Sequence, residues 1–159
     1  MRITAYQPEY IGQVVELSLR AWAPVFEAVQ QVMDAAVYDI LHPDWRVSQA
    51  KAVIDACSNN EAAIFVALEN DELPIGFIVV VFHEKDKMGE VYMIAVDPDY
   101  QNQGVGAALM HTATESMRSR GMAVALVRTG GDSGHAPARH LYERSGYSPL
   151  PTVSYFKEL

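Results

Sequence analysis

A glycine-rich turn in the middle of the chain has the residue types that bind a phosphate group. It runs from Asp97 to Gly106, follows a strongly apolar segment, and carries glycines at positions 104 and 106 just before a helical pattern. Glycine adopts backbone conformations that are closed to other residues, so successive N–H groups can converge on an anion, and the helix amino terminus adds partial positive charge. The turn therefore predicts an anion site built from backbone.

Two common phosphate-binding patterns do not fit this turn. Leu109 occupies the place where a dinucleotide fingerprint has its third glycine, and no Gly-Lys-Ser/Thr follows. A catalytic nucleotide site would also need metal-binding carboxylates, for which Asp97 and Asp99 are the only nearby pair. Taken alone, the segment also fits an ordinary strand-to-helix turn with glycines for close packing.

Two motifs together resemble the GNAT N-acetyltransferase superfamily. The spacing Gln101-x-x-Gly104-x-Gly106 is similar to the family's pyrophosphate loop, Q/R-x-x-G-x-G/A. The stretch from Ala138 to Tyr147 resembles the later part of the family's helix N-x-x-A-x-x-L-Y-x-x-x-G-F/Y, although His135 stands where asparagine is most frequent. The resemblance covers most of the chain after Ala63, while residues 1–60 match only in helical character.

The resemblance implies acetyl-CoA as co-substrate and no metal. The backbone of the glycine turn would hold the CoA pyrophosphate, the main chain of the preceding strand would pair with the pantetheine arm, and the histidine at the start of the last helix would lie beside the cofactor. The cofactor-binding residues expected on this basis are Ile94, Ala95, Val96, Gln101, Asn102, Gln103, Gly104, Val105, Gly106 and His135.

The catalytic candidates follow from the chemistry of acetyl transfer to an amine. A lysine-like amine has a pKa near ~10.4, so a base or a water chain must remove a proton during the reaction. By resemblance, Glu90 is the expected base, although it also fits a solvated strand end. A water chain is one alternative. His83 is another, because it lies near Glu90 if their two strands pair, although it also fits a surface histidine. Tyr142 matches the tyrosine that in many members points at the CoA sulfur, but a core tyrosine also fits its apolar helix face. The N–H of Ile94 would polarise the thioester carbonyl.

The elements expected to position these residues form a mixed α/β sheet with helices on both faces, in the order β-α-α-β-β-β-α-β-α-β. Apolar periodicity and turn residues set their limits, and the apolar Glu90–Val96 segment predicts a strand covered on both faces. The expected strands are Ile3–Tyr6, Ala63–Leu68, Ile75–Phe82, Glu90–Val96, Met122–Val127 and Val153–Phe156. The expected helices are Ile11–Trp22, Pro24–Leu41, Val105–Arg118 and Ala136–Ser145, with a further helical piece at Val47–Cys57.

Composition favours one globular domain over residues 1–159. The net charge of -8 opposes binding to nucleic acid or to an anionic membrane, because both need a basic face. Cys57 is the only cysteine, so no internal disulfide can form, and His135 and His140 do not have the i, i+4 spacing of a helical zinc pair. The amino terminus lacks the apolar core of a signal peptide, so we expect a cytoplasmic protein.

The function expected from these observations is transfer of the acetyl group of acetyl-CoA to a primary amine of a small molecule or peptide, by direct attack in a ternary complex. The alternative is a fold of the same kind that binds acyl-CoA without turnover, as a sensor or interaction module. An acidic protein favours a cationic acceptor, but the acceptor itself is not specified by the sequence. The resemblance also leaves room for a homodimer, because many members pair through their carboxyl-terminal strands.

Overall fold

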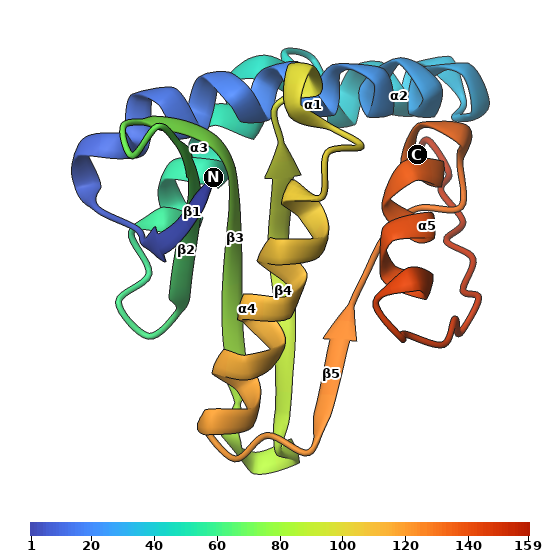
Figure 1. Ribbon diagram of the computed structural model, residues 1–159. Coiled ribbons are helices and arrows are strands. Elements are labelled where there is room, and N and C mark those ends of the chain that lie inside the picture. Colours follow the sequence, from blue (N-terminus) through green and yellow to red (C-terminus); the bar gives the residue numbers. More distant parts are fainter.

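Five strands form one mixed sheet in the computed structural model, which describes all 159 residues (Figure 1). The strand order is β1-β2-β3-β4-β5, antiparallel from β1 to β4, with β5 parallel to β4. The strands are β1 Arg2–Ala5, β2 Ala63–Glu69, β3 Leu73–His83, β4 Met88–Val96 and β5 Val124–Val127. The predicted mixed sheet of the α/β class with helices on both faces is confirmed.

The helices are α1 Ile11–Val32, α2 Ala35–Leu41, α3 Trp45–Cys57, α4 Val105–Ser119 and α5 Ala136–Arg144. Short 3-10 turns at Pro8–Tyr10, Glu84–Asp86, Pro98–Tyr100 and Ser133–His135 join several of them to the strands. The helical piece expected near Val47 is therefore real and forms α3. None of the helices combines the length and apolar character required to span a membrane.

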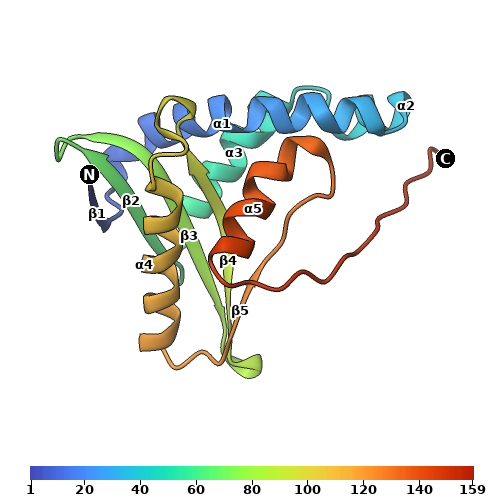
Figure 2. The ribbon, with the colours of Figure 1, turned by 45° about the vertical axis from the view of Figure 1, so that its right-hand side comes forward.

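The sheet separates two apolar cores (Figures 1 and 2). On one face, α1 and α3 cover the sheet, and Val14 packs in a cluster with Phe77 of β3. On the other face, α4 covers the sheet, and Leu109 joins a cluster with Ile78 of β3 and Tyr142 of α5. Since neighbouring residues of β3 enter opposite cores, the continuous apolar run of this strand reflects burial on both faces.

The predicted helix break before Pro24 is wrong, because α1 continues through this proline to Val32. A proline inside a helix removes one backbone hydrogen bond and costs about 3 kcal/mol. Packing beyond it offsets that cost, since Ala28 is buried and a Cβ on Gly134 would lie 2.9 Å from the Pro24 carbonyl oxygen. The helical run is interrupted ten residues later, where the Asp34 carboxylate accepts hydrogen bonds from backbone N–H groups in the first turn of α2.

The predicted last strand, Val153–Phe156, does not form. Residues 148–159 contain no regular element, and Figure 2 shows this tail leading away from the sheet. Tyr155 is 93% exposed, so the tail buries little apolar surface to offset its ordering. Pro149 and Pro151 lie just before the expected strand and have no N–H to donate to a neighbour. The homodimer expected through such a strand stays a prediction.

Candidate active site

Strand β4 has an open edge at its carboxyl-terminal half. Its pairing with β5 covers only Met88–Val91, whereas β4 continues to Val96, and Figure 1 shows the two strands diverging. The N–H of Asp97 donates to the Ile75 oxygen of β3 at 2.9 Å. Backbone groups alternate in direction along a strand, so those of residues 94 and 96 point to the open edge. This edge can accept an extended chain with alternating hydrogen-bonding groups.

The expected cofactor residues of β4 divide between the two sides of the strand. Ile94 and Val96 present their backbone to the open edge and their side chains to the core under α4. Ala95 is buried in the other core, and its backbone points toward β3. A bulge at Tyr92 shifts the register with β3 just before these residues. The open edge therefore has two residues after the bulge whose backbone N–H groups point outward, while the Val96 oxygen accepts a hydrogen bond from the Gln101 side chain.

The turn after β4 is held by its own side chains. Gln101 donates from Nε2 to the Val96 oxygen at 3.1 Å, and Gln103 donates from Nε2 to the Asp99 oxygen at 2.9 Å. The Asp97 carboxylate accepts the N–H of Asp99 at 3.0 Å. The first position of the Gln101-x-x-Gly104-x-Gly106 pattern thus fixes the turn through its side chain, which leaves the backbone amides of the turn for a ligand.

Two glycines shape the start of α4 for different reasons. Gly104 has φ +85° with open space around it, so the backbone conformation requires glycine there. A Cβ on Gly106 would lie 3.0 Å from Leu141 of α5, so close helix packing requires the second glycine. The Ala108 N–H donates to the Gly104 oxygen at 3.0 Å, and the amides before it have no partner within the helix. Free amides and the helix dipole together form an anion site.

Tyr142 of α5 lies in the core on the α4 side of the sheet and is 8% exposed. Burial, with a smaller contribution from Tyr147, raises the pKa of its phenol to about 12. A phenol with this pKa stays protonated at neutral pH and can donate its proton. The two expectations for this residue, a core position and a proton donor, are therefore compatible in this fold.

Glu90 lies at the centre of a charged cluster at the ends of three strands. His83 Nε2 of β3 lies 2.8 Å from Glu90 Oε2, and Arg128 Nη1, directly after β5, donates to Glu90 Oε1 at 2.5 Å. The Glu90 side chain is 11% exposed, against 41% for His83 and 72% for Arg128. The expected proximity of His83 and Glu90 is confirmed. Arg128 was not expected, because its position depends on how β5 aligns with β4.

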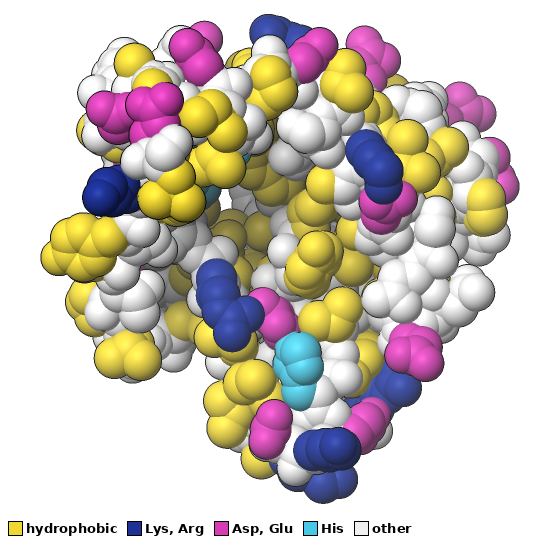
Figure 3. Space-filling view, turned by 180° about the vertical axis from the view of Figure 1, so that it is seen from behind, with side chains coloured by type: hydrophobic (Ala, Val, Ile, Leu, Met, Phe, Trp, Pro, Cys, Tyr) yellow, Lys and Arg dark blue, Asp and Glu magenta, His cyan; other side chains and the backbone are white.

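This cluster opens onto the face of the sheet opposite α4. Val79 of β3 lies in the core under α1 and α3, and His83 follows it by four residues on the same face of the strand. Figure 3 views this side and shows a hollow with apolar side chains inside it. Below the hollow, a histidine, an acidic and a basic side chain lie together in the same view. An acid–base group here would meet a substrate that enters from the α1 side.

His135 forms a close pair with Asp132 at the start of α5. Its Nδ1 lies 2.6 Å from Asp132 Oδ2, and its N–H donates to Asp132 Oδ1 at 3.2 Å. Burial acts to raise the pKa of Asp132, but the hydrogen bond and charge of His135 outweigh it and hold the pKa below the ordinary value. Arg139 donates to the Gly130 and Asp132 carbonyl oxygens at 2.7 Å. Only Nε2 of the His135 ring remains for a ligand.

Aromatic side chains pack between the amino-terminal helices. Phe26 of α1 stacks on Trp45 of α3 with ring centroids 4.5 Å apart, and His42 meets the edge of Phe26 at 5.4 Å. The Tyr38 hydroxyl donates to the Phe26 oxygen at 3.4 Å. These rings contact each other, so in this structure they hold the helices together.

The remaining reactive side chains form no metal centre: no group of three or more His, Cys, Asp or Glu side chains is placed to hold an ion. Cys57 is buried in α3, which raises the pKa of its thiol to about 11. This thiol is therefore protonated and unreactive at neutral pH.

Comparison with known proteins shows which family matches this chain. Residues 33–147 match the acetyltransferase (GNAT) family. Over 105 residues the chain is 34% identical to a mycothiol acetyltransferase of Thermomonospora curvata, covering 66% of this chain and 32% of that protein. The chain thus spans about a third of the length of this curated relative.

Solved structures share the fold at low identity. The ribosomal-protein-S18-alanine N-acetyltransferase of Escherichia coli superposes with a TM-score of 0.68 at 20% identity, covering 94% of this chain and 79% of that one. An aminoglycoside N-acetyltransferase in complex with CoA superposes with a TM-score of 0.57 at 15% identity, covering 80% and 96%. The family match extends over most of the chain, and this protein therefore belongs to the acetyltransferase (GNAT) family.

Proposed function

We propose that this protein transfers the acetyl group of acetyl-CoA to a primary amine of a small molecule or peptide. The observation that carries the proposal is the open edge of β4 leading directly into a turn with free backbone amides at the start of α4. The edge suits an extended amide-containing arm, and the turn suits the anion at the end of such an arm. Members of the family use acetyl-CoA, which has both features.

The residues that would hold acetyl-CoA belong mainly to the backbone. Amides from Gln101 to Gly106 are proposed to bind the pyrophosphate, and the main chain of Ile94 and Val96 to pair with the pantetheine arm. His135 would contribute the Nε2 atom that its bond to Asp132 leaves free. When bound, acetyl-CoA supplies an acetyl group activated as a thioester.

Three groups of the protein would then act on the reaction. The amine nitrogen forms a bond to the acetyl carbon as the carbon–sulfur bond breaks, and the Ile94 N–H stabilises the charge that develops on the carbonyl oxygen. The proton lost by the amine passes to the Glu90 and His83 pair, directly or through water. Tyr142, whose pKa of about 12 keeps it protonated, would donate a hydrogen bond or its proton to the departing sulfur.

The acceptor is proposed only as a class. Names of similar proteins include acetyltransferases for mycothiol, for aminoglycosides and for a ribosomal-protein alanine, and these names apply to those proteins. The net charge of -8 favours a cationic amine by long-range attraction. A small cationic amine or a basic peptide amino terminus is therefore the first acceptor class to test.

The test is release of free thiol from acetyl-CoA by the purified protein with a panel of polyamines, aminoglycosides, amino acids and peptide amines. We expect release that requires an amine and falls in Tyr142→Phe. If no amine gives turnover but acetyl-CoA raises the melting temperature, a CoA-binding sensor replaces the enzyme in this proposal. If acetyl-CoA neither turns over nor binds, the proposed cofactor site is wrong.

A further inference from the structure

The turn that is proposed to bind the pyrophosphate has no positive side chain of its own. From Asp97 to Gly106 the only charged residues are Asp97 and Asp99, and both are negative. Two carboxylates in the turn that forms the anion site oppose binding, because like charges repel. Some other part of the molecule must offset them.

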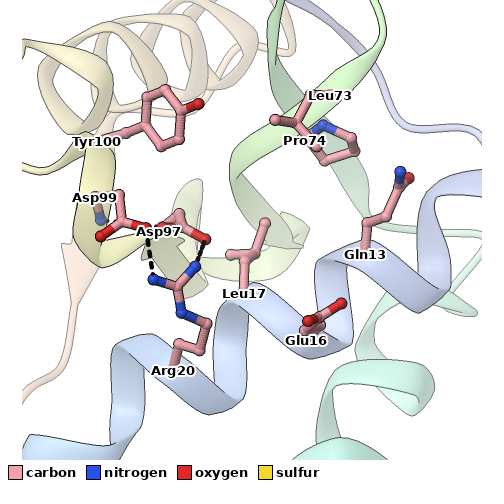
Figure 4. Close-up of a pocket in the computed structure, with 9 residues that line it drawn as sticks. All are labelled: Gln13, Glu16, Leu17, Arg20, Leu73, Pro74, Asp97, Asp99 and Tyr100. Atoms are coloured by element: carbon pink, nitrogen blue, oxygen red, sulfur yellow. Dashed lines mark hydrogen bonds and ion pairs between the residues drawn. The ribbon is translucent and has the colours of Figure 1, made fainter.

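Arg20 of α1 makes the offsetting contacts. Its Nη1 donates to Asp97 Oδ2 and its Nη2 to Asp99 Oδ2, each at 2.7 Å. Figure 4 shows the guanidinium reaching from α1 to both carboxylates at the side of a small pocket. The hydrogen bond with Asp99 and the charge of Asp97 raise the pKa of Arg20, so it stays charged. One cation from a distant helix thus pairs with both acidic groups and offsets one of their two negative charges.

The same contacts fix the shape of the turn. Asp97 uses Oδ1 to accept the N–H of Asp99 at 3.0 Å, while its other oxygen binds Arg20. The Asp97 side chain is only 12% exposed, and its backbone N–H donates to Ile75 of β3. The Tyr100 hydroxyl donates to Glu69, which holds the other side of the turn. Removing Arg20 would leave a nearly buried carboxylate without its charge partner, at the point where the turn begins.

We propose that Arg20 is a positioning residue for the cofactor turn, which makes acetyl-CoA affinity depend on the contact between α1 and the turn. Arg20 acts by reducing the negative charge of the Asp97 and Asp99 pair and by holding both carboxylates in one geometry. This inference rests on the proposed function, since it concerns the same cofactor site.

The test is calorimetric titration of CoA into Arg20→Met, Arg20→Lys and the wild type, with melting curves to establish that each variant is folded. We expect CoA to bind Arg20→Met at least tenfold more weakly. Arg20→Lys should lie between the two, since an ammonium supplies the charge but not the two-pronged geometry. Arg118→Met is the matched control, because it also removes one positive charge from an ion pair, here with exposed Glu115 on α4.

Two further readouts separate positioning from general damage to the fold. Adding Asp99→Asn to Arg20→Met should recover part of the CoA affinity, because it removes one uncompensated charge beside the site. In turnover, Arg20→Met should raise the KM for acetyl-CoA and leave kcat within about twofold, since Arg20 does not touch the reacting groups. Wild-type affinity in a folded Arg20→Met variant would overturn the inference alone. Absence of CoA binding by the wild type would overturn the proposed function and this inference together.

Discussion

The cofactor side and the acid–base side of the proposed active site are built from different parts of the chain. On the cofactor side, the groups offered to a ligand are backbone amides of β4 and of the turn before α4. On the acid–base side, they are the side chains of His83, Glu90 and Arg128, which come from three strands. A site built from backbone groups requires particular φ values and close packing, so it is marked in the sequence by glycines at fixed spacing. A site built from side chains requires only that residues distant in sequence lie close together in the fold, so no fixed spacing in the sequence marks it.

The largest expected effect is on the acid–base side. We expect Glu90→Gln to lower kcat about 100-fold or more, because it removes the charge that orients His83 and accepts the proton. The affinity for CoA, measured by calorimetry, should not change. Glu84→Gln is the matched control, since Glu84 pairs with Arg120 near the same strand ends but is exposed. An unchanged kcat in Glu90→Gln would contradict the proposed role of Glu90 in proton transfer.

On the cofactor side, Gly104→Val should weaken CoA binding at least tenfold, with less effect on kcat. The residue has φ +85°, a conformation that costs a residue with a branched Cβ about 1–2 kcal/mol or forces the turn to change shape. Calorimetric titration measures this effect. Gly12→Ala is the control: Gly12 lies in α1 with open space around it, so this substitution should leave the affinity for CoA unchanged. Equal affinities in both variants would show that the turn does not hold CoA.

Tyr142 connects the two sides, because it packs under α4 and is proposed to protonate the sulfur. We expect Tyr142→Phe to lower kcat about tenfold and to leave the dissociation constant of CoA within twofold. Since the phenol pKa is about 12, the wild type should show no loss of this proton donor up to pH 10. Steady-state kinetics against pH measures both effects, and Tyr155→Phe in the exposed tail is the control. A kcat equal to that of the wild type would assign Tyr142 to the core only.

The smallest expected effect is on stability at the Asp132–His135 pair. The pKa of Asp132 is depressed in the folded state, so its contribution is present above the ordinary value of 3.8 and is lost as pH falls through the folded value. Asp132→Asn should therefore lower the free energy of unfolding by about 1–2 kcal/mol at pH 6 to 7. The difference from the wild type should shrink as pH falls below 3.8. Denaturant unfolding at several pH values measures it, and a pH-independent difference would contradict the assignment.

The sequence predicted the features that depend on local backbone chemistry. The apolar strands from Ala63 to Val96 and the helix after Gly104 lie where they were expected, because burial and glycine conformation act within a few neighbouring residues. The contact between His83 and Glu90 could also be predicted from the sequence, because it requires only that two consecutive strands pair. The catalytic and cofactor roles assigned to the individual residues stay predictions.

Features that depend on distant packing were not predicted. Pro24 stays inside α1 because of Ala28 and of the loop around Gly134, which is about 110 residues away along the chain. The contacts of Arg20 with the turn after β4 and of Arg128 with Glu90 likewise join residues far apart in sequence. For the expected strand at Val153–Phe156, side-chain type favoured a strand, but the structure provides no neighbour for it.

We propose above all that the backbone of β4 and of the following turn holds the cofactor. The most direct test is an amide-resolved NMR titration of the isotope-labelled protein with CoA. We expect the largest shifts at the amides of Ile94, Val96 and Gly104 to Gly106, and only small ones in α2 and α3. Large shifts confined to the amino-terminal helices, with the turn unchanged, would contradict it.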